Sequence, residues 1–257
     1  MTLRLMCVLA HPDDESLGTG GVLAKYSREG IGTYVVCATR GQRGRFDDSG
    51  QSPGPEIVGR AREAELRAAA KELGVTDVSL LDYMDGELDR VDPVEAAEQI
   101  AVHIRRVKPD VIVTFDQYGA YGHPDHIAIS QLTTAAIVRA ADVHRASKLY
   151  YFIQSERKWD AYQAAFKTLT SNVDGAVRAA VAWPAWSITT IVDTSAAIPI
   201  VWRAIQCHKT QMSIYKNLES LSEDHKQVIF GLSEFYRVFS LVNGGRARET
   251  DLLEGLR

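Results

Sequence analysis

Apolar residues in the first half of the chain fall into short continuous runs that alternate with longer, helix-favouring segments. The runs predicted to be strands are residues 3–9, 33–38, 78–81, 110–115 and 149–153. The segments predicted to be helices are residues 16–29, 57–73, 93–107 and 124–141. Strands that are apolar throughout and separated by helices indicate a parallel sheet covered on both faces. We therefore predict an α/β fold, a three-layer Rossmann-like sandwich with a mostly parallel central sheet.

The second half of the chain is less regular. Its pattern predicts a strand at residues 188–192 and helices at residues 195–211 and 223–239, with no linker and no internal repeat. We expect one domain over residues 1–257, in which residues 1–155 form the α/β core and residues 156–257 complete the fold and the substrate pocket. Turn formers and charges at residues 41–55 predict a long loop, which could serve as a lid.

One imidazole and three carboxylates follow the first predicted strand, in His11, Asp13, Asp14 and Glu15. Carboxylates this close together repel one another unless a cation lies among them. Histidine and carboxylate ligands are also the usual composition of a hydrolytic zinc site. The alternative is that Asp14 or Ser16 caps the next helix and the remaining charges are solvated.

Two further histidines, His123 and His126, follow the fourth predicted strand. Pro124 suits the first position of a helix, so both imidazoles can face the same side of it. The His-x-x-His spacing is a weak signal alone. However, ligands of such sheets bind beyond the carboxyl ends of the strands, so the two motifs are expected to share one crevice.

The paired motifs resemble the PIG-L (LmbE-like) family of metal-dependent N-acetylglucosamine deacetylases. The likeness extends to residues 39–44, 62–65, 71–74 and 81–85, with a weaker echo at residues 208–211. One departure is Gly18, where mycothiol-type members have serine, which weakens any transfer of their particular substrate. The resemblance implies metal ligands His11, Asp14 and His126, the general base Asp13, an acid or electrostatic partner His123 oriented by Asp125, the carbonyl-polarising Tyr121, and substrate contacts from Arg62 and Asp85.

The predicted function is a hydrolase that uses Zn²⁺, or alternatively Fe²⁺, to remove an N-acetyl group from an N-acetylglucosamine-type small molecule. Alternatives are a metal-dependent amidase acting on a thiol conjugate, a hydratase, or an inactive relative that only binds sugar. A nucleotide-binding module is a more distant alternative, suggested by Gly18, Gly20 and Gly21. Leu23 replaces the third glycine of that motif, and the nearby carboxylates would repel a pyrophosphate.

Composition changes this interpretation little. The chain has 257 residues, of which 46% are hydrophobic and 24% charged, close to the averages for globular proteins. A formal net charge of -4 argues against a nucleic-acid partner. No apolar stretch approaches the ~20 residues that span a bilayer, and the start of the chain lacks a signal-peptide pattern, so we expect a cytoplasmic protein. Three scattered cysteines indicate free thiols, and a homo-oligomer is left open.

Overall fold

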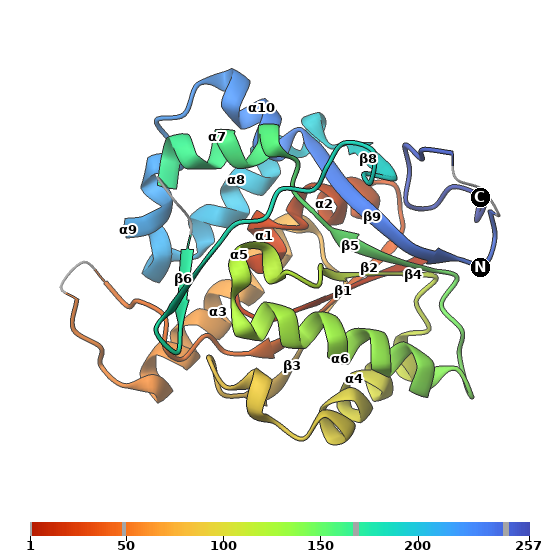
Figure 1. Cartoon of the computed structure of the whole chain (residues 1–257), viewed down its shortest axis with the longest axis horizontal. Helices are drawn as coiled ribbons and strands as arrows, with labels where there is room; N and C mark the ends of the chain where they lie inside the picture. Colours follow the sequence, from red (N-terminus) through yellow and green to blue (C-terminus); the bar gives the residue numbers. More distant parts are fainter. Residues whose placement is uncertain (1, 48–49, 167–169, 244–246) are drawn as a thin grey trace.

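A seven-stranded sheet forms the centre of the computed structural model, which describes residues 2–47, 50–166, 170–243 and 247–257. The strands follow the order β3-β2-β1-β4-β5-β9-β8 (Figure 1). The first five are parallel, whereas β9 runs antiparallel to both β5 and β8. The predicted α/β fold with a mostly parallel sheet is confirmed. The strands are β1 (Arg4–Leu9), β2 (Gly32–Thr39), β3 (Asp77–Tyr83), β4 (Val111–Phe115), β5 (Lys148–Phe152), β8 (Thr190–Asp193) and β9 (Leu232–Ser240).

Helices cover both faces of the sheet and give the three layers (Figure 1). One face carries α4 (Pro93–Val107) and α6 (Pro124–Ala140), and the other carries α2 (Gly20–Arg28), α3 (Pro55–Leu73) and α8 (Ile198–Cys207). The smaller elements are α1 (Asp14–Leu17), α5 (Gly119–Gly122), α7 (Glu156–Phe166), α9 (Met212–Tyr215), α10 (Glu223–Phe230), the hairpin of β6 (Thr170–Val173) and β7 (Ala176–Ala179), and the 3₁₀ turns Leu88–Arg90, Ser195–Ala197, Lys209–Gln211 and Lys216–Leu218. None of the helices among the described residues is long and apolar enough to cross a membrane.

The predicted helix over residues 223–239 is wrong in its second half. Helix α10 ends at Phe230, and β9 begins at Leu232 and inserts between β5 and β8. Aromatic and β-branched residues in 232–240 favour a strand, and Ser233 and Phe235 are buried with a period of two. The predicted helix over residues 195–211 likewise ends earlier, at Cys207. Helix α7 and the β6–β7 hairpin are elements that the sequence pattern did not predict.

The predicted helix over residues 16–29 is divided into α1 and α2 at Gly18 and Thr19. The glycines that follow serve close packing between helices. A Cβ on Gly21 would lie 2.8 Å from the Thr194 side chain, and one on Gly20 would lie 3.4 Å from Val201 in α8. Because the chain itself fills this space, the glycines do not form a phosphate-binding loop, and the nucleotide-binding alternative loses its support.

Strands β1 and β4 are neighbours, although about 100 residues separate them along the chain. They pair in parallel with Leu5 opposite Val111 and Cys7 opposite Val113. The order of the strands reverses between them, since β2 and β3 lie on one side and β5 on the other. Such a switch point opens a crevice at the carboxyl ends of the strands. Both histidine motifs follow these two strands directly.

Candidate active site

The turn after β1 holds Asp13 in an unusual backbone conformation, with φ of 112°. A non-glycine residue in this region is strained and is held there by its surroundings. The backbone N–H of Asp13 donates to Glu15 Oε2 at 2.8 Å. Nearby, Asp14 Oδ2 accepts the backbone N–H groups of His11 at 2.8 Å and Ala10 at 3.2 Å. Asp14 and Glu15 therefore fix the turn, while Asp13 and Asp14 also face the crevice.

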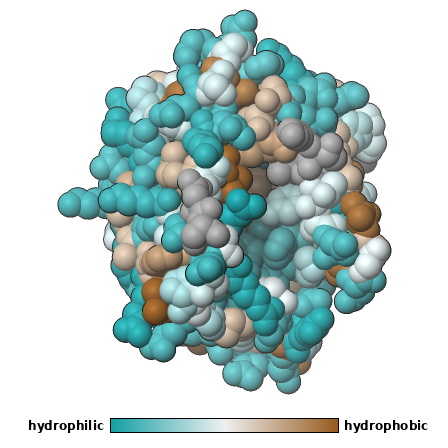
Figure 2. All heavy atoms as spheres, turned by 90° about the vertical axis from the view of Figure 1, so that its left-hand side faces the viewer, coloured by the Kyte–Doolittle hydropathy of each residue, from teal (hydrophilic) through white to brown (hydrophobic). Residues whose placement is uncertain are grey.

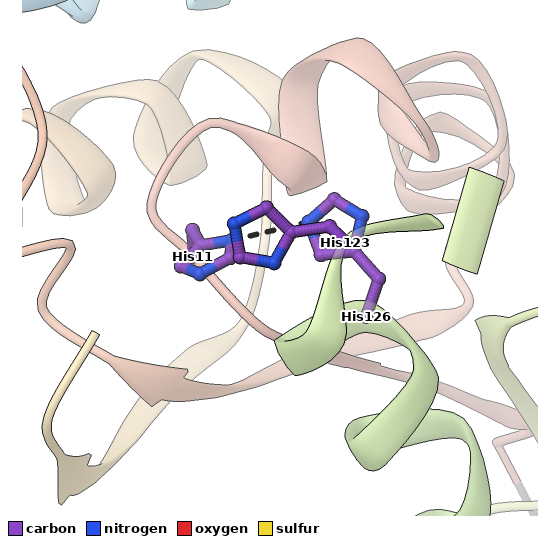
Figure 3. A group of neighbouring side chains, drawn as sticks. All are labelled: His11, His123 and His126. Carbon is purple, nitrogen blue, oxygen red and sulfur yellow. Dashed lines mark hydrogen bonds between the residues drawn. The ribbon is translucent and has the colours of Figure 1, made fainter. Parts of the chain in front are cut away.

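The second motif begins α6. His123 is the N-cap, and its Nδ1 accepts the backbone N–H of Asp125 at 3.2 Å, while Pro124 starts the helix as predicted. His126 is 3% exposed, and its ring stacks on Phe115 of β4 with centroids 3.9 Å apart. The capping bond and the stacking set the direction of both imidazoles, which point toward His11 (Figure 3).

Three side chains meet where the two motifs face each other. His11 Nδ1 lies 3.1 Å from His126 Nε2, and the two oxygens of Asp14 lie 3.8 Å from His11 Nδ1 and 3.7 Å from His126 Nε2. Tetrahedral zinc with ligands at ~2.0–2.2 Å separates its ligand atoms by about 3.3–3.6 Å. Burial lowers the pKa of His126 well below its ordinary value, which leaves a neutral imidazole able to bind a metal. The three residues fit a divalent cation, and His123 lies close enough to contribute to the same cluster.

The other nitrogen of His11 faces two carboxylates. Nε2 lies 3.1 Å from Asp125 Oδ2 and 3.1 Å from Asp85 Oδ1. A proton on Nε2 satisfies these acceptors and turns the lone pair of Nδ1 toward His126 and Asp14, as outer carboxylates do in zinc sites. Burial alone would lower the pKa of His11, but the two carboxylates raise it to about 10. The site thus favours a positive charge at His11, which a proton or a metal cation can supply.

The carboxylate of Asp125 contacts several groups of the site. It accepts the backbone N–H groups of Gly86 at 2.7 Å and Leu88 at 3.0 Å in addition to facing His11. His123 Nδ1 accepts the backbone N–H of Asp125 at 3.2 Å, while the Asp125 carboxylate faces His11. Asp85, expected to contact substrate, lines the cavity but also accepts the backbone N–H of Arg43 at 3.0 Å.

Asp13 is held by two donors. Arg62 Nη2 donates to its Oδ2 at 2.8 Å, and the hydroxyl of Tyr215 donates to the same oxygen at 2.6 Å. Arg62 is 4% exposed and also donates to the backbone carbonyls of Pro12 and Gly41, so its first role is to fix Asp13. No sequence pattern predicts a role for Tyr215, because it lies on α9 in a segment without a recognisable motif.

His208 pairs with Glu15 in the interior. His208 Nε2 lies 2.7 Å from Glu15 Oε1, and both side chains are fully buried. Glu15 in turn holds the backbone of Asp13, so the weak motif at residues 208–211 supports the first one. Further along, Gln211 Nε2 donates to the backbone carbonyl of Arg45 at 2.8 Å, which ties the loop over residues 41–55 to the site. Residues 48 and 49 of that loop lie outside the described residues.

A cavity of about 560 Å³ opens over these groups, within the range of small-molecule sites. Figure 2 shows the hollow on the face that lies to the left in Figure 1. Tyr121 lines it, with its ring centroid 5.5 Å from that of His126. Burial raises the pKa of Tyr121, so its phenol stays protonated and can donate a hydrogen bond. Burial and the nearby His11 lower the pKa of His123 to about 4.

Imidazoles and carboxylates gathered beyond the carboxyl ends of two parallel strands define a Rossmann-like protein with a candidate divalent-cation centre. Comparison with known proteins identifies the group. The chain belongs to the PIG-L family: residues 6–137 match the family described as GlcNAc-PI de-N-acetylase.

Individual relatives extend the likeness over the whole chain. The chain is 31% identical to a 1D-myo-inositol 2-acetamido-2-deoxy-alpha-D-glucopyranoside deacetylase of Kineococcus radiotolerans, over 98% of this chain and 83% of the relative. Two solved structures share the fold. The N,N'-diacetylchitobiose deacetylase of Pyrococcus horikoshii matches with a TM-score of 0.67 and 19% identity, over 91% of this chain and 83% of that one. The 4-carboxy-2-hydroxymuconate hydratase GalB of Pseudomonas putida matches with a TM-score of 0.67 and 21% identity, over 95% and 99%.

Proposed function

We propose that this protein is a zinc-dependent hydrolase that removes the N-acetyl group of an N-acetylglucosamine-type substrate. The observation that carries the proposal is the placement of a fixed carboxylate, Asp13, beside the convergent His11, Asp14 and His126. Membership of the PIG-L family and the names of its relatives support the substrate class. His and Asp donors suit Zn²⁺ and accept Fe²⁺ as well.

His11, Asp14 and His126 would hold the ion. With a divalent cation bound, these residues would present a water of lowered pKa and a polarised carbonyl group to Asp13. Asp13 is placed to take the proton of the attacking water, because Tyr215 and Arg62 hold its carboxylate in position. The phenol of Tyr121 and the imidazole of His123 line the cavity where negative charge develops on the carbonyl oxygen.

The reaction ends when the amine leaves with a proton. Asp13, once protonated, can return that proton to the nitrogen. His123 also lines the cavity, and because its pKa is lowered to about 4 it acts there as a neutral hydrogen-bond donor. Arg62 and Asp85 also line the cavity, where they can contact the hydroxyl groups of the sugar. We further propose a single domain over residues 1–257, since residues 159–166 and 211–215 line the same cavity as the first half of the chain. A cytoplasmic location and a homo-oligomeric state stay predictions.

An assay of acetate release tests the proposal. Metal-free protein is reconstituted with Zn²⁺ or with Fe²⁺ under anaerobic conditions and offered N-acetylglucosamine conjugates, acylated thiol conjugates and an unsaturated dicarboxylate. We expect acetate and free amine from the N-acetylglucosamine conjugates with metal, and none after a chelator has removed it. Turnover of only the thiol conjugates or only the dicarboxylate would instead identify the amidase or the hydratase alternative.

A further inference from the structure

One wall of the cavity is apolar and extends to the reacting groups. Trp159, Tyr162 and Phe166 line it from one face of α7, since positions three and four apart are neighbours on a helix. The ring centroids of Trp159 and Tyr162 are 5.7 Å apart, and those of Tyr162 and Phe166 are 6.1 Å apart. The row continues to the ring of Tyr215, 6.4 Å from that of Phe166. Tyr215 holds Asp13, so the apolar wall begins at the proposed general base.

The ring of Phe152 forms a second part of this wall, and its position depends on the absence of a side chain at Gly18. Gly18 has φ of -92°, which any residue can adopt, so the backbone does not require glycine. A Cβ there would lie 3.0 Å from Cε2 and Cζ of Phe152 and 3.0 Å from the carbonyl oxygen of Asp14. Glycine therefore leaves room for the ring of Phe152. That ring lies 4.4 Å from Phe115, which stacks on His126, so the wall also reaches a proposed metal ligand.

Polar groups line the cavity from other elements. Arg43, Asp85 and Gly86 come from the loops after β2 and β3, and His123 from the start of α6. In Figure 1, α7 and α9 lie on one side of the strand ends, and β3 lies on the other. Sugar hydroxyls lose free energy when they are buried without hydrogen-bond partners, whereas an alkyl chain needs none. The polar side therefore suits the amino sugar.

The two substituents of an amide carbonyl group leave it in different directions. A sugar on the polar side then places the acyl chain along the apolar wall. Leu17 also lines the cavity on this side, next to Gly18. We propose that this enzyme hydrolyses N-acyl groups longer than acetyl faster than it hydrolyses acetyl, with the wall of Leu17, Phe152 and α7 as the acyl-binding site; this proposal rests on the proposed hydrolase function. Water adds its oxygen to the carbonyl carbon, the C–N bond breaks, and a carboxylate and a protonated amine are released.

A chain-length series tests the proposal on the zinc-loaded full chain. The substrates are N-acetyl-, N-butyryl- and N-hexanoylglucosamine, with the octyl glycoside of N-acetylglucosamine as the arm for an apolar aglycone. We expect kcat/KM to rise about fourfold for each buried CH₂, hence about 15-fold from acetyl to butyryl.

A fall in kcat/KM at butyryl while acetyl is turned over overturns the inference and leaves the proposed function standing. A preference for the octyl glycoside without a preference for longer acyl groups also overturns it, because the wall would then hold the aglycone. If metal-loaded protein hydrolyses none of these substrates, the proposed function fails and the inference fails with it.

A matched pair of variants locates the effect. Phe166→Gln removes an apolar ring from the wall, and Trp186→Gln removes one that is 83% exposed and is not among the residues lining the cavity. We expect the ratio of kcat/KM for hexanoyl over acetyl to fall about tenfold in Phe166→Gln and to stay unchanged in Trp186→Gln. An unchanged ratio in a Phe166→Gln protein with native circular dichroism contradicts the assignment.

Discussion

The hydroxyl of Tyr215 donates a 2.6 Å hydrogen bond to Oδ2 of Asp13, across 202 positions of the chain. The same oxygen accepts a hydrogen bond from Arg62, so two donors fix one atom of the carboxylate. Burial and the charge of Asp13 raise the pKa of Tyr215 well above its ordinary value, which keeps the phenol protonated as a donor. In the proposed mechanism the second oxygen of Asp13, Oδ1, takes the proton of the attacking water.

Removing the Tyr215 hydroxyl tests this relationship. A hydrogen bond to a charged group contributes ~1.5–3 kcal/mol, so Tyr215→Phe should lower kcat/KM about tenfold to hundredfold. Steady-state kinetics on an N-acetylglucosamine conjugate measures the loss. Tyr26→Phe is the control, because it removes a hydroxyl that donates to Asp251 at 2.7 Å and is not among the residues lining the cavity. Equal activity of Tyr215→Phe and Tyr26→Phe would refute the positioning role.

Asp125→Asn should weaken metal binding. The Asp125 carboxylate accepts hydrogen bonds from His11 Nε2 and from two backbone N–H groups. Mutating a group that hydrogen-bonds to a metal ligand in this way changes metal affinity about 10- to 100-fold. Competition titration with a chromophoric chelator gives the dissociation constant for zinc. Asp92→Asn keeps a capping residue at the start of α4 and should leave the constant unchanged. The role of Asp125 is contradicted if both variants bind zinc as tightly as the wild type.

His208→Ala should destabilise the fold. It leaves Glu15 buried without its partner, and breaking a buried pair in this way costs about 3–5 kcal/mol. Urea unfolding followed by circular dichroism measures the change. The double variant Glu15→Gln/His208→Gln has no unpaired charge and should recover part of the loss. A free energy of unfolding within about 1 kcal/mol of wild type for the single variant is the contrary result.

Glu249 should make the free energy of unfolding depend on pH in the acidic range. Burial alone would raise its pKa, but hydrogen bonds from Lys148, Tyr150, Asn243 and Thr190 lower it from an ordinary 4.5 to about 2. A carboxyl group with a lowered folded pKa stabilises the protein above its unfolded pKa and loses that effect as the pH falls through its folded pKa.

The wild type should therefore be more stable than Glu249→Gln by about 2 kcal/mol at pH 7, after allowance for residual solvent screening. The difference should shrink from pH 4.5 down to about 2. Thermal unfolding of both proteins over this range measures it. A difference that stays constant as the pH falls would show that Glu249 does not titrate in this way.

Local patterns predicted the parts of the site that lie directly after strands. His11 and His126 could be placed together because parallel strands end at the same edge of the sheet, and the structure brings their nitrogens within 3.1 Å. The role of Tyr215 could not be predicted from the sequence, because its contact with Asp13 depends on how the second half of the chain folds back onto the first. The partners of the Asp125 carboxylate in residues 86–88 could not be predicted for a similar reason, because they belong to a distant loop.

In the fold, too, local patterns predict some elements, and contacts between distant segments decide others. The apolar runs predict all five parallel strands, whereas the pattern over residues 223–239 predicts a helix where β9 forms. Helix α10 directly precedes it, with only Gly231 between the two elements. Strand pairing with β5 and β8 decides the conformation of residues 232–240, and these partners are far away in the sequence.

In the proposed mechanism Asp13 removes a proton from water at a cation held by His11, Asp14 and His126. The most direct test compares acetate release and zinc content in wild type and Asp13→Asn, a variant of nearly the same shape. Zinc content should stay at the wild-type level while kcat falls at least ~100-fold, the contribution of a general base. An Asp13→Asn protein that holds zinc and releases acetate at a near wild-type rate would show that Asp13 is not the general base.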